Sequence, residues 1–388
     1  MPSPCGFTSR PIHDQSSAGC CSPAVVPVTQ RQSAEYNVHA SDYRDHRPLT
    51  GDGMNLWENH GWMVWDRQEN SDLLLWVSPY RVIGRQPSGP FALSDVALSQ
   101  TLLLHTEMNA DERESMHDTP FLAVGYDLGD HLPGDALRVE VDEAGTSWNV
   151  GERSFRATPP RWQVTGRHAG VNVDLDFEAT QEALWLTDPD QPIADSEDRW
   201  FLVDARVQGS VTTDEKTFQI SGHGSHERHV HLGTRYDPVA LLSSRGITWH
   251  SAAKDDIQLL LLSRPSLGHS WARLKVGDSS VAFDAASGDH CDIVETAHWQ
   301  DPQSNLMVPS AWRGFYSNSQ GTLAVNARAF ARAYYLWPHF KHGCTVLYWW
   351  LADATIEYQL TNGDQGFVEH VQYIAHDNRL LYRRHIND

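Results

Sequence analysis

The densest group of chemically active side chains lies in the segment Ser221–Gly233, which reads SGHGSHERHVHLG. Four histidines fall within nine residues there, at positions 223, 226, 229 and 231, and glycines border them on both sides. If the segment is an extended strand, Glu227, His229 and His231 project from one face, because alternate side chains share a face. A carboxyl group beside imidazoles can transfer protons near neutral pH. The pattern therefore predicts an acid–base site.

Two other interpretations of this segment remain open. A metal site needs at least three ligands that converge on one point, and His226, His229 and His231 would be the ligands. The carboxylate that often completes such a set is missing, because Asp237 comes too late in the chain. A solvated surface turn bordered by glycines is the second interpretation. A pocket lined by acid–base groups is favoured because glycines allow the backbone to approach a ligand closely. We therefore predict no bound metal, and we place Arg228 among the substrate contacts.

Tryptophan is abundant, with 15 residues of this type in a chain of 388. A cluster occurs in Trp57–Asp66, which reads WENHGWMVWD. Trp62 and Trp65 are three positions apart, so in a strand they face opposite sides. We expect one ring in a core and the other against a ligand, and both are predicted substrate contacts. The alternative is that both rings only fill a β core.

A third group lies near the C-terminus, in the segment Asn362–His370, which reads NGDQGFVEH. By alternation, Glu369 shares a face with Phe367. An acid on an apolar face is usually paired or functional, because burying an unpaired charge raises its pKa or destabilises the fold. Glu369 is therefore a fourth candidate acid. Phe367, Trp349 and Trp350 are predicted to line the same site.

The segments around these groups have the sequence pattern of β-strands. Short apolar runs stop at Gly, Pro, Asp or Asn, and several alternate with period two, as in Leu137–Asp142. Helical patterning is scarce, and Leu93–Thr106, with Ser94 as its N-cap, is the best helix candidate. The Pro-rich and acidic segment Thr187–Asp198 is the expected linker. We predict an all-β protein with two tandem lipocalin-like barrel or sandwich domains at 46–192 and 193–388, preceded by a disordered or strap-like tail at 1–45.

Composition excludes several classes of function. The 50 acidic residues against 30 basic ones give a net charge of -20, which argues against nucleic-acid binding. No apolar run reaches the length of about 18 residues that a membrane span requires. The N-terminus lacks the basic and apolar regions of a secretory signal, and five cysteines do not suggest a disulfide framework. We therefore expect a cytoplasmic protein. Nucleotide-binding and nucleophile-elbow motifs are absent, so no cofactor is predicted.

The segments Gly222–Gly233 and Gly366–His370 resemble a known family. It is the two-domain lipocalin-like family of carotenoid 1,2-hydratase and AttH, which includes kievitone hydratase and fungal Diels–Alderases. The resemblance implies two β-barrel-like domains, no cofactor, and an apolar substrate bound near the domain junction.

The match to the family signature is partial. That signature is a glycine-preceded stretch of Arg or His, then Asp, His, any residue, Trp and Gly. Glu227, Arg228 and Gly233 fit it. The departures are His229 at the Asp position, Val230 at the His position and Leu232 at the Trp position. His229 and His231 remain able to supply the proton chemistry.

The sequence thus predicts a lyase or isomerase of secondary metabolism that needs no cofactor: a hydratase, dehydratase, isomerase or cyclase acting on a terpenoid or polyketide-like molecule. Aromatic faces would stabilise the positive charge that protonation creates. Two alternatives stay open, a carbohydrate-active β-sandwich enzyme and a non-catalytic carrier of an apolar ligand. The partner expected in each case is a small molecule. The identity of that molecule and the oligomeric state are not determined by the sequence.

Overall fold

The computed structural model describes residues 38–46, 55–68, 70–84, 95–125, 131–185, 196–233, 248–254, 256–264, 269–339 and 343–381. Almost all regular structure in these residues is β-strand. The remaining elements are single turns of 3-10 helix: η2 (Ala40–Tyr43), η4 (Glu112–Glu114), η6 (Gly134–Ala136) and η8 (Ala285–Ser287).

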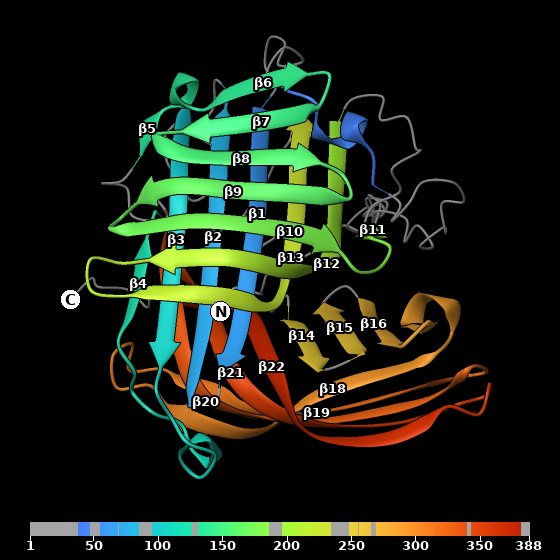
Figure 1. The fold of residues 1–388 in the computed structure, drawn as a ribbon. Helices are drawn as coiled ribbons and strands as arrows, with labels where there is room; N and C mark the ends of the chain where they lie inside the picture. The colour runs from blue at the N-terminus through green and yellow to red at the C-terminus, as the bar shows by residue number, and fades with distance from the viewer. Residues whose placement is uncertain are drawn as a thin grey trace, which may run out of the picture.

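The first sheet runs in the order β4-β3-β2-β1-β13-β12-β10-β9-β8-β7-β6, with β5 paired to β3 and β11 paired to β12. Its strands are β1 (Asn55–Gln68), β2 (Ser71–Ile83), β3 (Val96–Thr106), β4 (Phe121–Val124), β5 (Leu132–Pro133), β6 (Arg138–Asp142), β7 (Gly145–Val150), β8 (Glu152–Thr158), β9 (Arg161–His168), β10 (Val171–Ala179), β11 (Leu184–Trp185), β12 (Ser196–Thr212) and β13 (Thr217–Gly233). Figure 1 shows β1, β2 and β3 running crosswise to β7, β8 and β9, because the sheet curls on itself. The long strands β12 and β13 join these two halves.

The second sheet has the order β17-β16-β15-β14-β22-β21-β20-β19-β18 and lies beneath the first in Figure 1. Its strands are β14 (Thr248–Lys254), β15 (Ile257–Arg264), β16 (His269–Val276), β17 (Ser279–Asp284), β18 (His290–Gln300), β19 (Met307–Asn318), β20 (Gly321–His339), β21 (Gly343–Leu360) and β22 (Gln365–Leu381). It is also curled, so the described residues form two half-barrels. The predicted all-β, lipocalin-like class is confirmed.

Three large apolar cores among the described residues hold this architecture together. One fills the curl of the first sheet around Trp62 and Trp148, and a second fills the curl of the second sheet around Trp312 and Trp350. The third, which we call the junction core, takes residues from both sheets; Leu102 of β3 and Leu260 of β15 are among its fully buried members. The outer face of each half-barrel is thus buried against the other at the junction, where burial of apolar area stabilises the two-sheet arrangement.

Polar contacts also join the two sheets. The Arg67 guanidinium donates to the Asp353 carboxylate at 2.5 Å, and the buried Arg332 donates to the Thr119 carbonyl at 3.1 Å. The connection between β3 and β4 therefore binds to β20 of the second sheet, and the His117 amide donates to a β20 carbonyl at 2.9 Å.

Two expectations about the elements were wrong. The described part of the helix candidate Leu93–Thr106 is strand β3, because its residues are buried alternately in two cores: Leu98, Leu102 and Leu104 at the junction, and Leu103 inside the first half-barrel. Because both faces of β3 are apolar, its sequence lacks the alternation of apolar and polar residues that marks a strand with one buried face. The change of sheet falls between Gly233 and Thr248 rather than at the expected linker, whose last residues begin β12 of the first sheet.

Candidate functional site

Strand β13 carries most of the predicted site and lies in the middle of the first sheet. Its residues 223–233 pair with β1 on one side and with β12 on the other. Glu227 stands opposite Leu202 of β12, and His229 stands opposite Trp200. Leu202 and Trp200 belong to the junction core, so Glu227 and His229 face the second sheet.

Glu227 has the most unusual environment on this face. Its neighbours Leu202, Ser225 and His229 are buried, whereas Glu227 keeps part of its surface accessible. Loss of hydration raises the pKa of the Glu227 carboxyl to about 7, and the nearby indole of Trp200 lowers it by less. At neutral pH this carboxyl is present in both protonation states, so it can donate or accept a proton.

His229 is held between two tryptophans. Its ring meets Trp57 edge-on, with centroids 4.4 Å apart, and stacks on Trp200 with centroids 4.9 Å apart. The His229 side chain is buried. The carboxyl of Glu227, the imidazole and the two indoles therefore form one continuous patch on the junction face.

Further polar groups lie on the same face. The Ser78 hydroxyl donates to the Asn59 side-chain oxygen at 2.5 Å, and both residues are buried. Ser225 is buried two positions before Glu227, and its hydroxyl has no hydrogen-bond partner among the described residues. These groups offer a substrate hydrogen-bonding positions in an otherwise apolar surface.

The second sheet faces this patch with its own aromatic cluster. Trp349 lies 5.9 Å from Trp76 of the first sheet, measured between ring centroids, so the two Trp-rich segments meet at the junction. The His376 ring is 4.4 Å from that of Trp349, and burial lowers the pKa of His376 to about 3, which keeps it neutral. Gly61 is required beneath Trp76, because a Cβ atom at this position would overlap the indole ring.

The structure brings some of the predicted site residues together and separates others. Glu227, His229, Trp65 and Trp349 face the junction, whereas Trp62 and Trp350 fill the interiors of the first and second half-barrels. The backbone of His231 continues β13, but its side chain lies outside the described residues.

Glu369 and Phe367 are not part of this site. Phe367 is 61% exposed, Glu369 is exposed, and the Glu369 carbonyl accepts a hydrogen bond from Lys254. The expectation that both face inward is wrong. Alternation identified their common face correctly, but that face is the solvent side.

Arg228 points into the first half-barrel, away from Glu227. There it lies 3.7 Å from Glu58, whose carboxylate also pairs with Arg81 at 2.6 Å and lies 3.0 Å from His60. All these side chains are buried. Although burial by itself acts in the opposite direction, the Arg81 charge and the histidine contacts hold the pKa of Glu58 well below its usual range. Arg228 thus belongs to a buried ion network rather than to the junction patch.

Sequence reasoning missed two charged residues at the junction, Asp204 of β12 and Arg273 of β16. Asp204 is buried, and burial raises its pKa to about 6. The Asp204 carboxylate accepts a hydrogen bond from the buried Gln181. The sequence does contain a sign of both residues, because each is a single charged residue inside an apolar run. Asp204 lies in FLVDA (201–205), and Arg273 lies in WARL (271–274).

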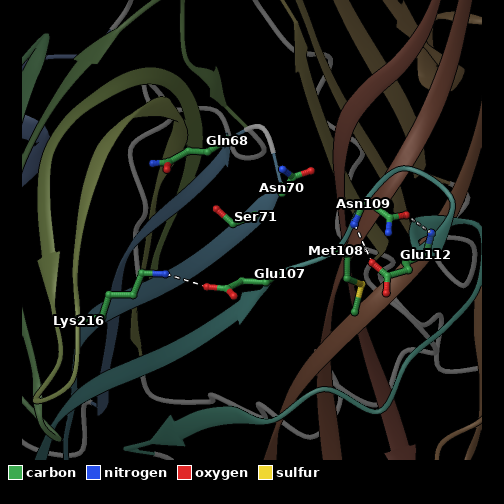
Figure 2. Close-up of a pocket in the computed structure, with 8 residues that line it drawn as sticks. All are labelled: Gln68, Asn70, Ser71, Glu107, Met108, Asn109, Glu112 and Lys216. Carbon is green, nitrogen blue, oxygen red and sulfur yellow. Dashed lines mark hydrogen bonds and ion pairs between the residues drawn. The ribbon is translucent and has the colours of Figure 1, made fainter.

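A polar pocket of about 480 Å³ opens at the rim of the junction core. Figure 2 shows the Lys216–Glu107 ion pair and the Glu112–Asn109 contact beside it. Met108 also belongs to the junction core. The pocket is lined by Gln68, Asn70, Ser71, Glu107, Met108, Asn109, Glu112 and Lys216.

The histidines of β13 do not form a metal site in the described part of the chain. His226 lies on the opposite face from His229 and donates through Nδ1 to the Gly61 carbonyl at 2.9 Å. Across the described ranges, no three His, Cys, Asp or Glu side chains gather closely enough to hold a metal ion. A helix long and apolar enough to cross a membrane is likewise missing from those ranges.

Comparison with known proteins shows which solved structures have a similar fold. No protein-family model and no curated protein matches the sequence. Among solved structures, CghA in its complex with Sch210972 superimposes with a TM-score of 0.52 at 10% sequence identity, over 86% of this chain and 89% of CghA. The chain has the fold of CghA. A putative AttH from Nitrosomonas europaea is also similar, with a TM-score of 0.47 at 13% identity, over 90% of this chain and 98% of that protein. The predicted resemblance to this two-domain lipocalin-like group is confirmed at the level of the fold.

Proposed function

We propose that this protein is an enzyme that binds a hydrophobic terpenoid or polyketide-like molecule between its two sheets and transfers a proton through Glu227. The reaction would be a hydration, dehydration, isomerisation or cyclisation, driven by the side chains of the junction face. The observation that carries the proposal is the Glu227 carboxyl, whose pKa is raised to about 7 and which belongs to a partly accessible residue in an aromatic patch. The fold shared with CghA, a Diels–Alderase, is compatible with a small-molecule substrate.

The proposed chemistry follows from the arrangement of these side chains. Protonated Glu227 donates to an alkene or to an oxygen of the substrate, and the conjugate carboxylate then removes a proton or directs water. Positive charge that develops on the substrate is stabilised by the faces of Trp57, Trp200 and Trp76. His229, held by Trp57 and Trp200, supplies a second polar group at the same patch. Exclusion of water strengthens the electrostatic interactions in such a site.

The test begins with the substrate. Organic extraction of the purified protein, followed by mass spectrometry, would identify an apolar molecule that copurifies with it. Turnover of that molecule is then compared among the wild type, Glu227→Gln and Glu369→Gln. The last variant makes the same chemical change at an exposed position.

We expect Glu227→Gln to lower kcat by roughly a hundredfold or more, because general acid–base catalysis contributes about 10²–10⁴-fold. We expect Glu369→Gln to retain wild-type turnover. Activity of the wild type should fall as the pH rises through about 7, where the Glu227 carboxyl loses its proton. Wild-type turnover by Glu227→Gln would overturn the assignment. Recovery of unaltered ligand at every pH would instead support the carrier alternative.

A further inference from the structure

Arg273 of β16 lies on the junction face of the second sheet. It pairs with Leu260 of β15, and Leu260 pairs with Ser251 of β14, so the three side chains form a row across the sheet. Leu260 belongs to the junction core, as does Trp271, which is two residues before Arg273. The guanidinium lies 5.7 Å from the Trp271 ring centroid, and Arg273 is only 8% exposed.

The Arg273 guanidinium is short of hydrogen-bond acceptors. A guanidinium carries five N–H donors, and its charge makes burial without acceptors costly. Nε and Nη2 of Arg273 are buried and have no hydrogen-bond partner within the described ranges. Ser251 and Ser225, which face the junction from opposite sheets, also have buried hydroxyls without a partner there. Several buried donors on the junction faces of the two sheets therefore lack an acceptor of their own in the described part of the chain.

Asp204 of the first sheet faces Arg273 across the junction without closing an ion pair. Lys275, two residues after Arg273 on the same face, donates to the Thr180 carbonyl at 2.5 Å, and the Thr180 amide donates to the Asp204 carbonyl at 2.9 Å. Asp204 and Arg273 each influence the other's pKa through their charges. Across the described residues, no salt bridge joins them. Nε and Nη2 of Arg273 therefore remain able to donate to an oxygen atom of a ligand.

This position lies next to Glu227. Asp204 pairs with Ser225, and Glu227 follows Ser225 by two residues on the same face of β13. Two residues of an extended strand span about 7 Å. One small molecule can therefore contact Arg273 with one end and contact Glu227 with the atoms next to that end.

We propose that Arg273, together with Ser225, forms a subsite beside Asp204 for an anionic oxygen, a carboxylate or an ionised enol, at one end of the apolar substrate. The inference rests on the proposed function, because it places the substrate at the junction. It adds that the substrate is an amphipathic acid whose charged end is fixed by Arg273. Glu227 then acts on carbon or oxygen atoms close to that end.

The test uses a matched pair of fluorescent probes, dansylaminoundecanoic acid and its methyl ester. They share an apolar chain and differ in the anionic end. Dissociation constants for both are measured with the wild type, Arg273→Met and Asp204→Asn. Arg138→Met serves as the control, because Arg138 is exposed on β6.

We expect the wild type to bind the acid more tightly than the ester by roughly tenfold to a hundredfold, the range for a hydrogen bond to a charged group. Arg273→Met should abolish this preference by weakening acid binding, with ester binding unchanged. Asp204→Asn should strengthen acid binding, because it removes a competing negative charge. Arg138→Met should behave as the wild type.

An unchanged preference for the acid in Arg273→Met would overturn the subsite. Equal binding of the two probes by the wild type would overturn the subsite and leave the binding of an apolar molecule at the junction in place. Failure of both probes to bind would overturn binding at the junction, and with it the proposed function. If Arg273→Met does not fold, the wild-type ratio and the direction of the Asp204→Asn change still decide the question.

Discussion

Glu227 and Arg228 are adjacent in β13, yet their side chains enter two different cores. Glu227 faces the junction between the sheets, and Arg228 lies in the ion network inside the first half-barrel. One strand thus supplies a proton-transfer group on one face and structural charge on the other. The two groups can therefore be tested separately, one by catalysis and pH dependence and the other by stability.

Glu58→Gln should destabilise the fold strongly. The Glu58 carboxylate shares the buried Arg81 with Asp45 and lies 3.7 Å from the buried Arg228, so its loss removes a negative charge from beside two buried guanidinium groups. Removing one partner of a buried pair costs about 3–5 kcal/mol, measurable by urea unfolding. Glu178→Gln, which breaks the exposed pair with Arg161, should cost less than about 1 kcal/mol. Equal losses in the two variants would contradict the structural role of Glu58.

Glu227→Gln should stabilise the protein above neutral pH. Because the pKa of Glu227 is raised in the folded state, the unfolded chain loses this proton at a lower pH than the folded chain does. The contribution of Glu227 to the free energy of unfolding is therefore fully present below about pH 4.5 and is lost as the pH rises towards 7. The loss is about 1.4 kcal/mol for each unit by which the pKa is raised, before allowance for the partial exposure of the side chain. The difference between Glu227→Gln and the wild type should grow over this window in unfolding curves. A constant difference would show that the carboxyl titrates normally.

Buried neutral histidines should make the fold sensitive to acid. Burial lowers the pKa of His60 to about 4 and those of His250 and His376 to about 3. Between pH 6.5 and these values the unfolded chain binds protons that the folded chain does not, so stability falls as the pH falls. His250→Gln should reduce this slope in unfolding experiments between pH 6.5 and 4. An identical slope in the variant would mean that His250 is protonated in the folded state.

Gly61→Ala should disturb the junction through Trp76. The added methyl group overlaps the Trp76 indole, which contacts Trp349 of the second sheet. We expect a loss of roughly 1–3 kcal/mol and a change in tryptophan emission. In a Trp76→Leu background the ring is gone, so Gly61→Ala should cost much less. Additive losses in the double-mutant cycle would show that the methyl group clashes elsewhere.

The alternation of apolar and polar residues in the sequence determined much of the local structure. Short runs with turn signals were sufficient to predict an all-β chain, and the spacing of Trp62 and Trp65 placed them on opposite faces. It also placed Glu227 and His229 on one face, as the register confirms. These properties follow from the geometry of a single strand, in which successive side chains point to opposite sides.

The tertiary structure decided which face meets which partner. The sequence could not show that both faces of β13 are buried, nor that the face of Phe367 and Glu369 is open to solvent. Pairing of β1 with β13 joins residues more than 150 positions apart, and the junction of Trp76 with Trp349 joins two sheets. Asp204 and Arg273 face each other for the same reason. Such relationships depend on how the sheets curl and pack, and that is set by the total burial of apolar surface rather than by any local pattern.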